Sequence, residues 1–240
     1  MNSIIMTGLS DTGRTRTSNE DCILCLPALG AALIADGMGG HNAGEVASRT
    51  AVDTISAILR QTVRGVSPHE RLETALQAAH SVIREKARHS LRCRGMGTTC
   101  VAVLIEGGYL HHAHVGDSRL YLLRGGKLMP LTRDHSLLQE FVDQGFYTRE
   151  EALEKVSRNI LTRALGLEAQ VTVDYDYIKV HKNDRFLLCS DGLYDMINEI
   201  EMASLLGRPH DLEGIALDML ELANARRSTD NVSVIVIAGF

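Results

Sequence analysis

Paired glycines between short apolar runs are the feature that most limits how this chain can fold. Gly107-Gly108 and Gly125-Gly126 each lie between two runs rich in β-branched and aliphatic residues. A tight two-residue turn between antiparallel strands requires positive φ values, which glycine adopts readily. A glycine pair between two such runs therefore indicates a hairpin. Runs that resemble strands cover residues 31–35, 98–105, 109–115, 119–123, 127–131, 171–180, 185–189 and 232–238. The sequence therefore predicts sheets that are mainly antiparallel.

Two long helical patterns follow one another before the hairpins begin. The first covers residues 43–63 and carries an apolar stripe at helical spacing. The second begins after Ser67, because Ser67, Pro68 and Glu70 supply an N-cap, a first-turn proline and a capping-box partner. Helices that arrive together, rather than one after each strand, argue against a doubly wound parallel sheet. We expect an α+β fold in which helices cover a sandwich of two sheets, with a further helix over 211–226.

The bulk properties indicate one globular domain over residues 1–240. The chain has no linker-like or repetitive segment, and hydrophobic residues make up 45% of it, enough for a substantial core. The formal net charge is -5, so general attraction to nucleic acid or to anionic membranes is not expected. A local basic stretch over residues 84–94 is expected to be a solvated helix end and loop. No apolar run approaches the roughly 20 residues of a membrane helix.

The cysteines and a group of histidines are poor candidates for metal ligands. The five cysteines are sparse and odd in number, which favours reduced thiols and a cytoplasmic location. Cys22 and Cys25 form a lone C-x-x-C, and alternation along a strand would place them on opposite faces. His111, His112 and His114 lie on a predicted strand. We expect these histidines to pack or to lie at the surface rather than to bind a metal.

Four aspartates lie where an apolar strand pattern begins or ends: Asp36, Asp117, Asp191 and Asp230. Each of them taken alone is more simply explained as part of a turn. As a set, carboxylates that converge on one edge of a sandwich would repel one another unless a cation lies between them. Mg²⁺ and Mn²⁺ prefer carboxylate, carbonyl and water oxygens. The set therefore favours a divalent metal site in a metal-dependent phosphoester hydrolase.

Arginines lie just before another acidic group. Arg14 and Arg16 precede Asn19-Glu20-Asp21, and a guanidinium can bind a phosphate with paired hydrogen bonds. Taken alone, these arginines are better explained by a weak surface ion pair between neighbours.

Eight short motifs, in order along essentially the whole chain, resemble those of one family. Each motif is weak alone, but eight in order are specific. The chain resembles the metal-dependent protein serine/threonine phosphatases of type 2C, the PPM family, and its DGMGG form resembles the bacterial branch. The motifs are Arg16-x-x-Asn19-Glu20-Asp21, Asp36-Gly-Met-Gly-Gly-His41, Gly97-Thr98-Thr99, His114-Val-Gly-Asp117-Ser-Arg119, Leu131-Thr-x-Asp134-His135-Ser136, Thr162-Arg163-Ala-Leu-Gly166, Ser190-Asp191-Gly192 and Asp230-Asn231-x-Ser233.

The resemblance implies an α-β-β-α sandwich with a binuclear Mn²⁺ or Mg²⁺ site at one end. By motif matching, Asp36 bridges the two metals. Glu20 and the carbonyl of Gly37 serve one metal, and Asp191 and Asp230 serve the other.

Further roles follow from the same matching. Asp117 matches a ligand of a third, weaker metal in bacterial members, Asp21 acts through bound water, and Arg16 holds the substrate phosphate. A water activated by two metals attacks phosphorus in line, without a phosphoenzyme intermediate. His41 is the candidate general acid. Its assignment rests on the bacterial pattern, because the eukaryotic pattern has a histidine where this chain has Met38.

The polar segment over residues 136–165 is expected to be largely helical. Within it, residues 137–160 fall where bacterial members carry a flap beside the active site. A polar element there could select substrates.

The resemblance also sets the expected partners. We expect a monomeric phosphatase for phosphorylated proteins that opposes a bacterial serine/threonine kinase of the eukaryotic type. One alternative is a catalytically silent module of the same fold that binds phosphoproteins, and the complete set of carboxylates argues against it. Another is a phosphatase for a nucleotide or other small molecule, which the absence of a nucleotide-binding glycine motif disfavours.

Overall fold

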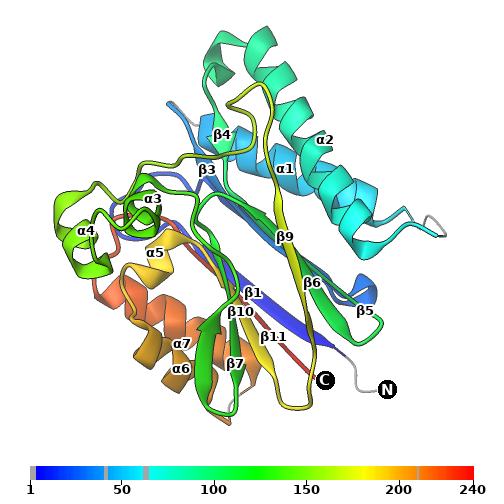
Figure 1. The fold of residues 1–240 in the computed structure, drawn as a ribbon, viewed down its shortest axis with the longest axis vertical. Coiled ribbons are helices and arrows are strands. Elements are labelled where there is room, and N and C mark those ends of the chain that lie inside the picture. The colour runs from blue at the N-terminus through cyan, green and yellow to red at the C-terminus, as the bar shows by residue number, and fades with distance from the viewer. Residues whose placement is uncertain (1–3, 41–42, 62–64, 210) are drawn as a thin grey trace.

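The strands form two antiparallel sheets that pack face to face (Figure 1). The computed structural model describes residues 4–40, 43–61, 65–209 and 211–240. One sheet has the order β1-β11-β10-β7-β8, and the other has the order β2-β3-β5-β6-β9 with β4 paired to β3. The strands are β1 (Ile5–Asp11), β2 (Asp21–Leu26), β3 (Ala31–Met38), β4 (Gly97–Thr98), β5 (Cys100–Glu106), β6 (Tyr109–Val115), β7 (Arg119–Arg124), β8 (Lys127–Pro130), β9 (Asp174–Lys179), β10 (Arg185–Cys189) and β11 (Val232–Ala238).

Helices cover both outer faces of this sandwich. Figure 1 shows α1 and α2 over the sheet of β3, β5 and β6, and α6 and α7 over the sheet of β10 and β11. The helices are α1 (Ala43–Leu59), α2 (Pro68–His89), α3 (Leu137–Asp143), α4 (Arg149–Lys155), α5 (Asp191–Tyr194), α6 (Glu199–Leu206) and α7 (Leu212–Ala225), with short 3-10 turns η1 (Pro27–Leu29) and η2 (Leu91–Cys93). The expected α-β-β-α arrangement is confirmed. None of the described helices is long and apolar enough to cross a bilayer.

The core consists of three apolar layers, and alternation along each strand divides residues between them. Leu33 faces α1 and α2, whereas its neighbour Ile34 faces the other sheet. In the same way, Val234 faces α7 while Ile235 lies between the sheets. Cys22 and Cys25 also lie on opposite faces of β2 as free thiols. The two thiols therefore do not form one zinc or disulfide site.

The local turn and cap signals form as predicted. Both glycines of each hairpin turn have positive φ, between 58° and 81°, as a type I′ turn requires. Ser67 caps α2 in a complete capping box with Glu70. Helix α1 ends at Leu59, four residues before the predicted end at 63, and residues 62–64 lie outside the described part of the chain.

Three predicted segments are different in the structure. The stretch over residues 136–165 is not largely helical, because α3 and α4 have only 7 residues each. The strand predicted over 98–105 is broken at Thr99, whose backbone N–H donates to the carbonyl of Asp36 (2.9 Å). The strand predicted over 171–180 begins only at Asp174.

Candidate active site

One cavity of about 210 Å³ collects the residues that the sequence singles out. It is lined by Arg16 and by all six predicted metal ligands, which are Glu20, Asp36, Gly37, Asp117, Asp191 and Asp230. Asp21 does not line the cavity and is buried beside it. His41, the predicted general acid, lies outside the described residues, so its role stays a prediction.

Asp36 lies inside β3, two residues before the strand ends. Asp21 in β2 is directly opposite it in the β2–β3 register. The backbone N–H of Asp36 donates to Thr99 Oγ1 (3.0 Å). Thr99 Oγ1 also shares a hydrogen bond with the Ser118 hydroxyl (2.6 Å). Thr99 therefore ties the Asp36 backbone to the turn that carries Asp117.

Gly37 sits where no side chain fits. A Cβ there would lie 2.1 Å from the carbonyl oxygen of Gly44 and 2.6 Å from that of Glu20. The Gly37 N–H donates to the Glu20 carbonyl (3.2 Å). The first turn of α1, the end of β3 and the Glu20 backbone therefore meet at Gly37, which places two predicted ligand residues side by side.

Asp21 is buried behind the cavity and held by two serines. The hydroxyls of Ser190 and Ser233 donate to Asp21 Oδ2 at 2.9 and 2.6 Å. Burial raises the pKa of Asp21 to about 6, and the two hydroxyls offset part of that effect. Asp21 Oδ1 is buried and has no partner among the described residues. A buried carboxylate oxygen without a partner indicates a place for a water or a cation.

Asn231 joins the two ends of the chain at this site, a role that its motif did not predict. Its side chain is 3% exposed. Asn231 Nδ2 donates to the carbonyls of Thr12 and Ser18 (2.9 Å each), and Asn231 Oδ1 accepts from the Glu20 N–H (2.8 Å). These three bonds fix the loop that presents Arg16 and Glu20. The asparagine of the Asp-Asn motif was the available signal.

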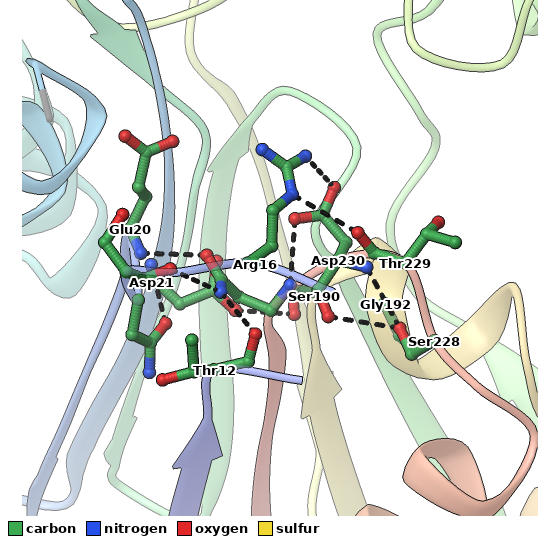
Figure 2. A network of polar contacts seen from close by, with 12 residues as sticks. Thr12, Arg16, Glu20, Asp21, Ser190, Gly192, Ser228, Thr229 and Asp230 are labelled. Atoms are coloured by element: carbon green, nitrogen blue, oxygen red, sulfur yellow. Dashed lines mark hydrogen bonds and ion pairs between the residues drawn. The ribbon is translucent and has the colours of Figure 1, made fainter. Parts of the chain in front are cut away.

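Arg16 lies at the rim of the cavity, over Asp230. Figure 2 shows the two side chains facing each other, with Thr229 beside them. Arg16 Nη2 is 2.7 Å from Asp230 Oδ2, and Arg16 Nε donates to the Thr229 carbonyl (3.3 Å). The Arg16 side chain remains 47% exposed. Its guanidinium is therefore positioned at the site and still open to an incoming anion.

Asp117 and Asp191 line the cavity from two other strand ends. Asp117 lies two residues after the end of β6, and Asp191 lies two residues after the end of β10, at the start of α5. Gly192 allows this approach, because a Cβ there would lie 2.0 Å from the carbonyl oxygen of Asn231. Asp191 Oδ1 is buried without a partner among the described residues.

The carboxylates of the cavity destabilise one another in their charged forms. Burial, followed by repulsion from neighbouring aspartates, raises the pKa of Asp36 and of Asp191 well above the usual range. Burial and the nearby Asp134 raise the pKa of Asp117 to about 7. A bound cation would remove this cost. Because the donors are oxygens throughout, the site fits hard divalent cations such as Mn²⁺ or Mg²⁺.

A second group with metal-ligand chemistry contains His114, His135 and Asp174. The Gly116 N–H donates to His135 Nδ1 (3.1 Å), so the proton of a neutral ring is on Nε2, 3.2 Å from Asp174 Oδ2. His114 Nε2 lies 2.8 Å from the carbonyl of Arg133, which can only accept. Burial lowers the pKa of both rings, that of His135 to about 4. Only His114 Nδ1 remains free, so this group does not offer three ligand lone pairs.

The segment over residues 137–160 stands beside the cavity. Its end is held by an ion pair between Arg158 and Asp195 (3.4 Å), just after α5. A small cavity of about 30 Å³ lies between this segment and the acidic site, with Arg149 and Arg158 on one side and Asp117 and Asp191 on the other. The segment therefore borders the predicted ligands, as expected of a flap.

Comparison with known proteins decides the family. The family model described as "Protein phosphatase 2C" matches residues 14–214. The chain belongs to the protein phosphatase 2C family. This family uses metal-dependent catalysis, and the chain is accordingly a serine/threonine protein phosphatase.

Relatives of this chain are similar over nearly its whole length. The serine/threonine phosphatase stp of Listeria innocua is 37% identical over 95% of this chain and 93% of its own length. The crystal structure of Mycobacterium tuberculosis PstP/Ppp has a TM-score of 0.90 at 36% identity and covers 98% of both chains. A structure of the PstP catalytic domain in complex with two manganese ions has a TM-score of 0.87 at 35% identity, over 98% of this chain and 97% of that one.

Proposed function

We propose that the acidic cavity binds two divalent cations, Mn²⁺ or Mg²⁺, for the hydrolysis of phosphoserine and phosphothreonine in proteins. The observation that supports this proposal is one cavity lined by five carboxylates and the Gly37 backbone, with Arg16 at its rim. When bound, two cations would supply a water of lowered pKa as the nucleophile and neutralise charge on the phosphoryl oxygens. Their presence in a related PstP domain agrees with this proposal.

The proposed ligands form two sets, one for each cation, and Asp36 belongs to both. The charges of Asp21, Asp191, Asp117 and Asp230 act on the Asp36 carboxylate, and Asp36 would be the ligand shared by the two cations. The Glu20 carboxylate and the Gly37 carbonyl would hold one cation; these two residues are kept adjacent by the hydrogen bond from the Gly37 N–H to the Glu20 carbonyl.

The other predicted ligands lie across the cavity. Asp191 and Asp230 would hold the second cation, and Asp117 with Asp191 a third and weaker one. Burial is the main cause of the raised pKa of Asp191, and Asp117 and Asp230 raise it further.

Three residues would act without binding a metal directly. Asp21, fixed by Ser190 and Ser233, would orient water at the metals. Arg16 would bind two oxygens of the phosphate through its guanidinium, for which Asp230 and the Thr229 carbonyl hold it in place. His41 is our proposed proton donor to the serine or threonine leaving oxygen.

Replacing Arg16 with alanine is expected to raise KM for a phosphothreonine peptide by about tenfold or more, because a charge-assisted pair of hydrogen bonds is lost. Arg16→Lys should recover only part of this loss, since an ammonium cannot bind two oxygens in the same plane. Steady-state kinetics with Mn²⁺ measures both variants.

The matched control for Arg16 is Arg14→Ala. Arg14 is exposed, precedes Arg16 by two residues and does not line the cavity. The Arg14→Ala substitution should leave KM for the phosphothreonine peptide unchanged. Equal effects of the two substitutions would show that general positive charge, rather than a phosphate contact of Arg16, assists binding.

We further propose that this chain acts as one domain in the cytoplasm, as a monomer, against an opposing serine/threonine kinase. The continuous core of three apolar layers supports a single domain. The flap at residues 137–160 would contact the substrate beside the phosphate. The expected partner is a kinase whose substrates this chain dephosphorylates in a purified mixture. A kinase whose substrates stay phosphorylated under the same conditions is not the partner.

A further inference from the structure

A group of arginines projects from the turn that follows α2. Helix α2 ends at His89, and η2 carries the chain toward β4. Leu91 is 89% exposed, and Arg88, Arg92 and Arg94 are exposed as well. We refer to these four residues as the basic ridge. Two hollows flank it, of about 400 and 530 Å³, and both are lined by Leu91 and Arg94.

Intramolecular contacts explain only part of this charge. Arg84, before the ridge, donates to the Ala169 carbonyl (3.0 Å), and Arg88 approaches Glu85 to 4.0 Å. Arg88 also lies in the last turn of α2, where positive charge stabilises the helix end. Arg92 and Arg94 lie beyond the helix, and their side chains have no ion pair or hydrogen bond to any residue that the structure describes. Their charges are therefore available to another molecule.

The basic ridge lies next to the active site. Gly39 lines the acidic cavity, and Gly40, the next residue, lines the larger hollow with Leu91, Arg92 and Arg94. On the other side, η2 leads to β4, which pairs with the end of β3 at Gly37 and Met38. Figure 1 shows β4 beside β3, below the end of α2. A peptide with its phosphorylated residue in the cavity can therefore continue across Gly40 onto the ridge.

We propose that the basic ridge docks an acidic segment of the phosphoprotein substrate, next to its phosphorylated residue. This proposal rests on the function proposed above. The whole chain carries a net charge of -5, so a cationic surface at the rim of the active site is a local exception. Complementary charge of this kind strengthens and orients substrate encounter. Arginine is common at protein interfaces, and an exposed leucine among arginines adds apolar contact for a peptide.

The test is the double substitution Arg92→Glu and Arg94→Glu in the full chain with Mn²⁺. Two phosphothreonine peptides are compared that differ only in flanking residues, three aspartates in one and three asparagines in the other. For the wild type, the acidic peptide should have the lower KM, and this advantage should shrink as salt is added. In the variant, KM for the acidic peptide should rise about tenfold while KM for the neutral peptide changes little.

A matched control carries the same change of charge elsewhere. Arg60 and Lys127 are exposed at the end of α1 and at the β7–β8 turn, and neither lines the cavity or the hollows beside the ridge. Arg60→Glu with Lys127→Glu should leave the preference for the acidic peptide intact. No preference in the wild type, an equal loss in the control, or an equal loss for both peptides would overturn the proposal.

Hydrolysis of p-nitrophenyl phosphate separates this proposal from the proposed function. That substrate has no flanking residues, so the variant at Arg92 and Arg94 should hydrolyse it like the wild type. If the wild type hydrolyses it only with Mn²⁺ but the peptide preference is absent, the docking surface alone is wrong. If wild-type hydrolysis does not need a divalent cation, the proposed function is wrong.

Discussion

Replacing Asp36 with asparagine is expected to lower kcat/KM for a phosphothreonine peptide by roughly 10³-fold or more. The substitution keeps the size of the side chain but removes a charge that lines the cavity together with the other ligand carboxylates. A neutral amide oxygen is a much weaker bridging ligand for divalent cations. Hydrolysis of p-nitrophenyl phosphate should fall similarly, because the metals act on the phosphate whatever the leaving group.

The same substitution should stabilise the protein when no divalent cation is present. In the folded chain, burial and repulsion raise the pKa of Asp36 well above its usual value. Because the folded-state pKa is the higher one, ionisation of Asp36 costs stability as the pH rises from the unfolded-state value through the folded-state one. At neutral pH in EDTA, Asp36→Asn should therefore have a higher Tm than the wild type. A lower Tm together with lost activity would indicate misfolding rather than a lost ligand.

A matched control for Asp36 is Asp53→Asn. Asp53 is exposed on α1 and does not line the cavity. The Asp53→Asn substitution should change neither the activity nor the response to EDTA. Retention of most activity in Asp36→Asn would show that this carboxylate does not hold the catalytic metals.

Replacing Asn231 with aspartate is expected to destabilise the protein by about 3 kcal/mol or more. The shape is unchanged, but the Nδ2 donor that binds the Thr12 and Ser18 carbonyls becomes an oxygen that cannot donate to them. A buried charge is also introduced, since this side chain is only 3% exposed. Denaturant unfolding in EDTA measures the loss of stability apart from metal binding.

The Asn231 substitution should also weaken Mn²⁺ binding by roughly 10–100-fold, because the loop that presents Glu20 loses the two Nδ2 hydrogen bonds that anchor it. Asn198→Asp makes the identical chemical change at the N-cap of α6. There the native side chain uses its oxygen as an acceptor from the Glu201 N–H (3.0 Å), and aspartate caps helices as well as asparagine does. If both substitutions had the same small effect, Asn231 would not be the anchor of the metal-site loop.

Features encoded by neighbouring residues were predictable from the sequence. The glycine turns at 107–108 and 125–126 and the capping box at Ser67 each depend on residues within a few positions of one another. The arrangement of the sheets depends on distant parts of the chain. Strand β1 pairs with β11, near the opposite terminus, and no local pattern specifies that neighbour. The layered class could be inferred, whereas the strand order could not.

The site shows the same difference between features set by neighbouring residues and contacts between distant ones. The acidic residues could be found because each lies within two residues of a strand end and belongs to a recognisable motif. Asn231 could not be assigned a role, because its three partners lie more than 200 residues away in the sequence. The support of Asp21 by Ser190 and Ser233 also spans more than 160 positions. Such contacts appear only when the two ends of the chain meet.

The polar segment after β8 was predicted poorly for a physical reason. Its composition is compatible with helix, yet Gly145 adopts a φ of 73° and ends the first helix early. The segment closes on itself instead, through contacts of Phe141 with Phe146 and Tyr147. Helical propensity is a weak guide where short elements pack on one another.

The central claim is that the acidic cavity binds the divalent cations on which hydrolysis depends. The most direct measurement is a calorimetric Mn²⁺ titration of protein stripped with EDTA, with phosphopeptide hydrolysis followed in parallel. We predict no hydrolysis before Mn²⁺ is added, two Mn²⁺ bound tightly per wild-type chain as activity returns, and loss of tight binding in Asp36→Asn. Full activity in EDTA, or Mn²⁺ binding that is unchanged in Asp36→Asn, would contradict the claim.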